Sequence, residues 1–303
     1  MRYDGGHKRD DFLMGTVAPF VEWVGVCPEV EMGMPVPRPA VRLEQPEPGA
    51  GPGPRMVDPK SGADHTSAMN KYAARRVAAL AKENLDGYVL KKDSPSCGLE
   101  RVRVHNSSGM PERKGVGLFA AELLARLPLL PVEDEGRLND PGIRENFFAR
   151  VFAYRRLKAA LHARWTVGDL VRFHTAEKCL LLAHDPQAYR ELGRLVAGAK
   201  AVTRAELAEL YPAGFMKALR KMATPRKHQN VLQHMQGHFS EQLTAGERAE
   251  LSTLIEDFGN RLVPLIAPVT LIRHFVRRFD VQYLAGQSYL EPSPKELMLR
   301  NHA

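Results

Sequence analysis

The sequence predicts an α/β domain with a Rossmann-like sheet, followed by an all-α helical domain. With 303 residues, of which 44% are hydrophobic, the chain is long enough for two domains of about 150 residues each. Residues 1–150 mix short β-type runs with loops rich in glycine and proline. Residues 151–303 contain successive helical patterns with almost no β-type alternation. We therefore expect the first domain to cover 1–150 and the second 151–303.

In the first half, short runs typical of strands alternate with helical stretches, as in an α/β layer. The expected strands cover residues 22–26, 88–91 and 129–132, the last weakened by Pro131, and the expected helices cover 67–83 and 118–127. The segment 45–55 (QPEPGAGPGPR) has the composition of an interdomain linker. Because only about forty residues precede it, we expect an excursion within one domain instead.

In the second half, several segments have the residues that begin helices. A Ser or Thr hydroxyl can accept a free backbone N–H while an acid three residues later reaches back, and proline fits the first helical position. The expected starts are Thr166/Asp169, Thr203/Glu206, Thr244/Glu247, Asp185-Pro186 and Thr224-Pro225. Within residues 226–239, one helical stripe is apolar and is expected to be core; it consists of Val231, Leu232, Met235 and Phe239. These patterns predict a helical bundle.

The net positive charge of the chain comes from the second half. Residues 1–150 contain 21 Lys and Arg against 21 Asp and Glu, whereas residues 151–303 contain 22 against 14. A basic domain favours a polyanionic partner, because clustered cations release counterions on meeting phosphate; a solvated basic surface is the alternative. We expect a cytoplasmic protein, since the first fifteen residues are charged and no apolar run is long enough to span a membrane.

The three cysteines are widely spaced, which argues against a disulfide framework. Cys27 and Cys97 each follow a predicted strand, where open α/β sheets place their sites, so both could present a thiolate to one metal centre. The alternative is that both are small buried hydrophobic residues. Cys179 lies in the apolar run CLLLA and is expected to be core.

Long motifs in both halves resemble known families. RYDGGHKRD (2–10), CPEVEMGMPVPRP (27–39), DSPSCGLERVRV (93–104) and GVGLFAAEL (115–123) are similar to the bacterial thiouracil desulfidases. The second half is similar to the helical domain of YbgA-type proteins through WTVGDLVRFHTAEKCLLLAHDPQAYRELGRLVA, TPRKHQNVLQHMQGHF and VPLIAPVTLIRHFV. The fused pair resembles RNA desulfidases that convert 4-thiouridine of tRNA to uridine, and this implies an iron–sulfur enzyme with tRNA as its partner.

The resemblance also implies a cofactor, because in that family three cysteines hold a 4Fe-4S cluster and leave one iron without a protein ligand. The matching residues are Cys27 and Cys97. The third cysteine of the family falls upstream of Met1, and the family often has valine at that position. We therefore expect that a GTG valine codon was taken as the start and that the natural chain is longer. A two-cysteine site would hold a cluster poorly.

The chemistry indicates further site residues. Replacing C=S by C=O requires a Lewis acid for the departing sulfide and a base that activates water. On the matching motifs, we expect Glu29 to transfer the proton and Ser94 to orient the base ring or the water. Structural alternatives are an ion pair for Glu29 with an arginine and a turn cap for Ser94 before Pro95.

Further contacts with the substrate are expected in both halves. Asp4 is expected in a tight turn with Gly5 and Gly6 near the cluster. The candidate contacts to nucleotide phosphates are Arg38, Lys91, His174, Lys178, Arg226 and Lys227. A zinc site on His228, His234 and His238 is disfavoured, because the chain has no HExxH motif.

Two other functions remain open at this level. One is an enzyme that acts on free thiouracil or thiouridine nucleotides, which would not need the basic domain. The other is a noncatalytic RNA-binding protein whose cluster site has decayed, as two cluster cysteines in place of three would allow. No obligate protein partner and no membrane partner are evident from the sequence.

Overall fold

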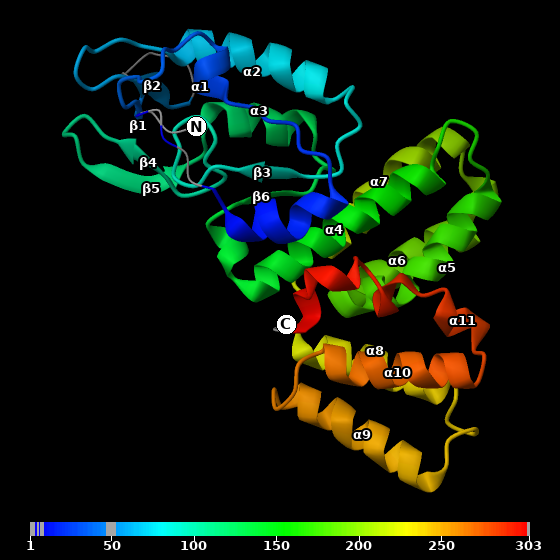
Figure 1. Ribbon diagram of the computed structural model, residues 1–303. Helices are drawn as coiled ribbons and strands as arrows, with labels where there is room; N and C mark the ends of the chain where they lie inside the picture. Colours follow the sequence, from blue (N-terminus) through cyan, green and yellow to red (C-terminus); the bar gives the residue numbers. More distant parts are fainter. Residues whose placement is uncertain (1–3, 5, 7–8, 47–52, 302–303) are drawn as a thin grey trace. The chain divides into compact units, whose positions relative to one another are not determined.

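The computed structural model describes residues 4, 6, 9–46 and 53–301, and the chain forms two compact units, 1–139 and 140–303 (Figure 1). Residue 150, where we expected the domain boundary, lies inside the long helix α4 (Pro141–Ala160). Divided at Asn139, the chain keeps its charge asymmetry. The first unit has 19 basic and 19 acidic residues, and the second has 24 and 16.

The strands of the first unit form two sheets. The larger has the order β2-β1-β4-β5, with bounds Arg55–Val57, Arg42–Glu44, Val102–His105 and Pro111–Gly115. Strands β1 and β4 are parallel, while the two outer pairs are antiparallel. The smaller sheet pairs β3 (Tyr88–Leu90) with β6 (Val132–Asp134) in parallel. A Rossmann-like sheet is therefore not confirmed, although α/β character is.

The strand predictions were right in part. The strand expected at 88–91 is β3, whereas the one expected at 129–132 begins only at Val132, after Pro131. Proline has no N–H for a ladder, and here its carbonyl accepts the N–H of Tyr88 at 2.8 Å. The strand expected at 22–26 is wrong, because this segment has no regular secondary structure and pairs with no described strand. Its Trp23 and Val24 are 41% and 46% exposed.

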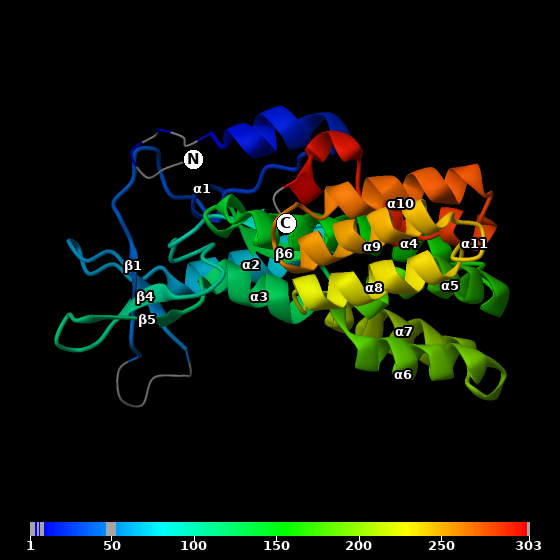
Figure 2. The same cartoon turned by 90° about the horizontal axis from the view of Figure 1, so that it is seen from below.

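Two helices, α2 (Thr66–Leu80) and α3 (Leu118–Arg126), pack against each other in the first unit, as both views show (Figures 1 and 2). Their apolar faces meet in a buried core where the Tyr72 and Phe119 rings lie 6.1 Å apart. Short helical segments complete the unit: η1 (Phe12–Val17), η2 (Ala18–Phe20), α1 (Pro28–Glu31) and η3 (Arg137–Asn139). The Pro/Gly-rich segment leads into β2 within this unit and marks no boundary.

The second unit is a helical bundle, as predicted. After α4 its helices are α5 (Val167–His184), α6 (Pro186–Ala197), α7 (Arg204–Leu219), α8 (Pro225–Gly237), α9 (Ala245–Gly259), α10 (Ile266–Arg278) and α11 (Gln282–Ala285). Short 3-10 turns are η4 (Ala199–Ala201), η5 (Ser288–Leu290), η6 (Lys295–Leu297) and η7 (Leu299–Asn301). None of the helices in the described residues is long and apolar enough to cross a membrane.

All five predicted helix starts are confirmed. Thr166, Thr203 and Thr244 each form a reciprocal capping box with the acid three residues later. Asp185 and Thr224 accept a backbone N–H at the starts of α6 and α8. The predicted stripe of α8 is also core, because Val231, Leu232, Met235 and Phe239 are at most 1% exposed.

An ion pair with a buried carboxylate anchors the C-terminal segment to the bundle. Arg156 on α4 donates to both oxygens of Glu177 at 2.6 and 3.1 Å, and Ser288 donates to the same carboxylate at 2.6 Å. Arg156 also donates to the Pro292 carbonyl at 3.0 Å. The Glu177 side chain is 1% exposed, so its charge depends on these partners.

We predict that Arg156→Met lowers the free energy of unfolding by about 3 kcal/mol, because it leaves the Glu177 carboxylate buried without its counter-ion. Urea unfolding measures this. The matched control is Arg172→Met, which breaks the ion pair to Asp169 from a side chain that is 74% exposed. It should cost less than about 1 kcal/mol. Equal losses in both variants would contradict the prediction.

Candidate active site

The loop that carries Cys97 is held beneath the start of α3. The N–H of Leu118 donates to the Pro95 carbonyl at 3.1 Å. Those of Phe119 and Ala120 donate to the Ser96 carbonyl at 3.0 and 3.1 Å. The first N–H groups of a helix have no partners within it, so this loop provides them. The sequence DSPSC therefore folds as a cap for α3, and this fixes the position of the Cys97 backbone.

Two glycines allow this close packing. A Cβ on Gly117 would lie 2.4 Å from the Ser96 carbonyl oxygen and 2.7 Å from the Cys97 nitrogen. A Cβ on Gly98 would lie 2.7 Å from the Ser94 carbonyl oxygen. Both glycines are therefore required by close backbone approach.

Cys27 lies at the N-terminal cap of α1, directly before Pro28 at the first helical position. The Cys27 N–H donates to Glu31 Oε1 at 2.9 Å, and the Tyr72 hydroxyl donates to Glu31 Oε2 at 2.6 Å. The carboxylate of Glu31 thus ties the Cys27 backbone to helix α2. Cys27 and Cys97 are both half-buried free thiols.

The environment of Cys97 disfavours an ionised thiol without a cation. Burial raises the pKa of Cys97 to about 12, and the charges of Glu29 and Cys27 act in the same direction, while hydrogen bonds from Ser96 and Ser94 oppose them. Since metals bind the thiolate, a nearby cation would favour the ionised form of Cys97.

Glu29 lies on α1, two residues after Cys27, and contacts the loop that carries Cys97. Its Oε2 accepts from Arg38 Nε and Nη2, both at 2.7 Å, and its Oε1 accepts from Ser96 Oγ at 2.7 Å. The Ser96 hydroxyl is also 3.6 Å from Cys97 Sγ. The carboxylate predicted for proton transfer therefore lies beside the cysteine loop and contacts a buried guanidinium.

Ser94 lies in the same loop and is half-buried. Its Oγ accepts the N–H groups of Ser96 and Cys97 at 3.3 and 3.2 Å and lies 2.9 Å from Ser96 Oγ. Cys27, Glu29, Ser94 and Cys97 are thus brought together from distant parts of the sequence. Ser96 completes the set but was not predicted; a second serine between Ser94 and Cys97 was the available signal.

The cluster that the resemblance implies finds two ligands here. Cys27 and Cys97 present thiols from two loops, which is the donor type that iron–sulfur clusters require. Among the described residues, the cysteine site included, no group of three His, Cys, Asp or Glu side chains could hold a metal. The third cysteine of the set was expected upstream of Met1, outside the printed sequence. The pair fits part of a cluster-binding set.

Arg38 corrects one expectation. We predicted a contact to a nucleotide phosphate, but its side chain is only 3% exposed and is engaged with Glu29. Lys91 forms an ion pair with Glu135 from a side chain that is 49% exposed. Asp4 accepts the N–H of Gly6 at 3.0 Å, which is compatible with the expected turn; Gly5 lies outside the described residues.

Among the basic-domain candidates, His174 is corrected by its burial. It is 3% exposed, and its Nδ1 is 3.0 Å from the Tyr211 hydroxyl, so it cannot reach a phosphate. Lys227 is half-buried and donates to the carbonyl of His184 at 2.7 Å, at the end of α5. Arg226 is exposed and Lys178 is half-buried. Those two remain candidates for phosphate contact.

The histidines of α8 have separate environments. His228 is buried with its Nδ1 2.9 Å from the Tyr289 hydroxyl, whereas His234 and His238 are exposed. Cys179 is buried, as predicted, and lies in the bundle where its N–H donates to Gln287.

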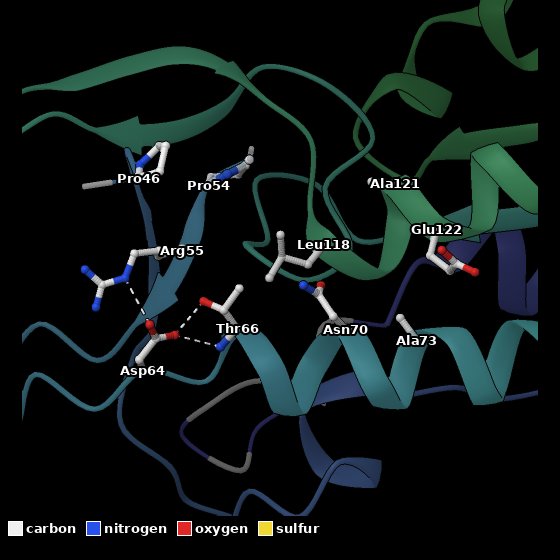
Figure 3. A pocket seen from close by; sticks show the side chains of 11 residues that line it. Pro46, Pro54, Arg55, Asp64, Thr66, Asn70, Ala73, Leu118, Ala121 and Glu122 are labelled. Atoms are coloured by element: carbon white, nitrogen blue, oxygen red, sulfur yellow. Dashed lines mark hydrogen bonds and ion pairs between the residues drawn. The ribbon is translucent and has the colours of Figure 1, made fainter. Parts of the chain in front are cut away.

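A separate cleft of about 720 Å³ lies beside α2 and α3 (Figure 3). Its polar wall contains Asp64, which pairs with Arg55 and accepts from Thr66, and these groups therefore satisfy one another. Neither cysteine and neither Glu29 nor Ser94 lines it. The cleft is distinct from the cysteine site in its lining.

The chain thus consists of an α/β unit that contains the cysteine site and a basic helical unit. Known families match both parts. The 2-thiouracil desulfurase family matches residues 1–135, and the family described as "Protein of unknown function (DUF1722)" matches residues 178–294. Each match covers less than half of the chain, so the N-terminal part is similar to the first family and the C-terminal part to the second.

Two individual proteins are similar to this chain. The uncharacterized protein YbgA of Escherichia coli (strain K12) is 33% identical over 153 residues, which is 50% of this chain and 90% of YbgA. Among solved structures, the [4Fe-4S]-dependent thiouracil desulfidase TudS is 29% identical over 46% of this chain and 84% of TudS, with a TM-score of 0.35.

We predict that Gly117→Ala disrupts the cysteine loop, since its methyl group would meet the backbone of Ser96 and Cys97. The expected loss of stability is about 1–3 kcal/mol, as for other overpacked sites, together with less iron bound after anaerobic reconstitution. Thermal unfolding and iron analysis measure the two effects. Gly15→Ala is the control, because nothing lies within 4 Å of a Cβ there. Normal iron binding by Gly117→Ala would contradict the prediction.

A second prediction concerns acid. Burial lowers the pKa of His174 to about 4 from the ordinary 6.5, with the Lys178 charge acting in the same direction. Between about pH 6.5 and pH 4, the unfolded chain binds a proton at His174 and the folded chain does not. Stability therefore falls as the pH drops from about 6.5 to about 4, and His174 does not change it above that range. The difference is on the order of 3 kcal/mol. In urea unfolding across this range, His174→Gln should flatten the pH dependence; an unchanged slope would contradict it.

Proposed function

We propose that this protein is an iron–sulfur-dependent desulfidase of thiolated uracil, and that its substrate is 4-thiouridine in tRNA, which it converts to uridine. One observation carries the proposal. In the part of the chain that matches the 2-thiouracil desulfurase family, the buried Glu29 carboxylate, two residues after Cys27, is hydrogen-bonded to the serine loop that carries Cys97. The proposal extends this family assignment to RNA and to a defined set of residues.

Cys27 and Cys97 would hold a 4Fe-4S cluster together with a third ligand from outside the described residues. When bound, such a cluster with one iron free of protein ligands would supply a Lewis acid for the sulfur of the substrate. Because burial and nearby negative charge disfavour the Cys97 thiolate, the positive charge of iron is what would keep it ionised.

The remaining chemistry belongs to the protein side chains. Glu29, held as a carboxylate by Arg38, accepts a proton from the water that attacks the ring carbon. Ser94, anchored by two backbone N–H groups, orients the base or the water beside it. The balance is C=S plus water giving C=O plus hydrogen sulfide, with no net oxidation or reduction.

The basic second unit favours RNA as the carrier of the thiolated base. Its 24 basic and 16 acidic residues leave a positive excess that the first unit lacks. The exposed side chain of Arg226 and the half-buried Lys178 are among its cations available to phosphate. A base stacked in folded tRNA would have to become accessible before it could enter the site.

A second substrate is favoured by the family assignment, whose name specifies 2-thiouracil. A free base or nucleotide would need only the cysteine site and no basic unit. The two candidates differ in salt dependence, because binding through phosphates weakens steeply with salt whereas binding of a free base does not.

The test is the 4-thiouridine content of bulk tRNA before and after anaerobic incubation with reconstituted protein. We expect loss of 4-thiouridine with an equal gain of uridine, and a rate that falls between 50 and 200 mM salt, the range over which phosphate contacts typically weaken. Turnover of 2-thiouracil with intact tRNA 4-thiouridine would replace the tRNA proposal by the free-base enzyme. Binding of tRNA without turnover of either would favour a noncatalytic RNA-binding protein.

The catalytic assignments give a further prediction. Glu29→Gln should lower kcat by about 10²–10⁴-fold while iron content is kept, because the amide cannot accept the proton of water. Cys97→Ser should lose iron and activity together. Ser61→Ala, which removes a serine–carboxylate bond to Asp58 elsewhere in the unit, is the control and should retain both. Full activity of Glu29→Gln would remove this residue from the mechanism.

A further inference from the structure

Glu29 is held from both sides. Arg38 occupies Oε2 with two N–H groups at 2.7 Å, and Ser96 donates to Oε1 at 2.7 Å. These partners come from separate loops, Arg38 from nine residues along the chain and Ser96 from 67 residues along it. The carboxylate therefore has one orientation, and each oxygen is fixed by a different donor.

The partners differ from Glu29 in their accessibility. The Glu29 side chain is 12% exposed, whereas the Arg38 side chain is 3% exposed and Ser96 is 1% exposed. Of the three side chains, that of Glu29 is the most exposed, whereas Arg38 and Ser96 are almost wholly shielded from solvent. Any contribution of Arg38 and Ser96 to the reaction must therefore pass through another residue.

The direction of the hydrogen bonds links Ser96 to Ser94 as well. Ser94 Oγ accepts two backbone N–H groups, so its own proton is available for Ser96 Oγ at 2.9 Å. The single proton of Ser96 goes to the Glu29 carboxylate, which as an anion can only accept. The hydrogen bonds therefore run from Ser94 to Ser96 and from Ser96 to Glu29. Arg38 donates to the other oxygen of Glu29.

We propose that Arg38 and Ser96 are positioning residues, which hold Glu29 and Ser94 as one hydrogen-bonded unit beside the two thiols. The inference rests on the proposed function, for which it identifies the groups that set the geometry. A glutamate has three rotatable side-chain bonds, and a displacement of about 1 Å at a reacting group can cost on the order of 10²-fold in rate. Fixing both oxygens removes that freedom before substrate arrives.

The first experiment is a double-mutant cycle on activity toward 4-thiouridine in tRNA. Ser96→Ala should lower kcat about 10- to 100-fold with KM changed less than about twofold, because substrate does not touch Ser96. In the Glu29→Gln background the same change should have little further effect, since its route of action is already lost. Effects that multiply fully would overturn the proposal, because a merely structural defect acts independently of Glu29.

Arg38 is tested by two substitutions. Arg38→Lys keeps the charge but can replace only part of the two-point contact, so it should retain more kcat than Arg38→Met. Iron and sulfide content must equal those of the wild type in every variant that is compared. Ser61→Ala serves again as the control and should leave kcat unchanged. Equal kcat for Arg38→Met and the wild type would show that Arg38 does not position Glu29.

A second measurement does not depend on turnover. In cluster-free full-length protein, urea unfolding of Ser96→Ala, Glu29→Gln and the double variant should give non-additive losses, and so should the Arg38→Met and Glu29→Gln pair. If the wild type shows no turnover, the proposed function fails, but the unfolding cycle still tests whether Arg38 and Ser96 position Glu29. If the losses in free energy of unfolding are additive, the proposed coupling of Arg38 and Ser96 to Glu29 is overturned, whatever the activity.

Discussion

The contact between the DSPSC loop and the first turn of α3 is the constraint on which the candidate site depends. The free N–H groups of the helix require acceptors, and the carbonyls of Pro95 and Ser96 supply them. Gly117 permits the close approach. This backbone contact sets the positions of Ser94, Ser96 and Cys97, and through Ser96 it also sets the carboxylate of Glu29. A helix terminus thus organises side chains that it does not itself provide.

The two units use buried charge differently. In the first, Glu29 and Arg38 form a pair in which the Glu29 side chain is 12% exposed. In the second, Glu177 and Arg156 bind the C-terminal segment to the bundle, and the carboxylate is closed to solvent. The two ion pairs therefore differ in the exposure of their carboxylate side chains.

The sequence was sufficient for local features and insufficient for contacts between distant segments. Helix caps such as Thr166/Asp169 were predicted correctly because both partners lie within one turn. The strand expected at 22–26 was wrong, because alternation indicates a strand only if a partner strand is present. His174 and Arg38 were predicted as phosphate contacts from charge alone, and each is buried against a residue from another element.

By itself, the sequence determined the helical second half, its positive charge, and the motifs that relate the two parts to known families. Composition, helix caps and short motifs are properties of neighbouring residues, so they can be read without the fold. The tertiary structure alone decided that Arg38 serves Glu29, that Ser96 joins it to Ser94, and that the strands form two sheets. Those outcomes depend on burial and on pairing across up to 67 residues of chain, which local sequence cannot specify.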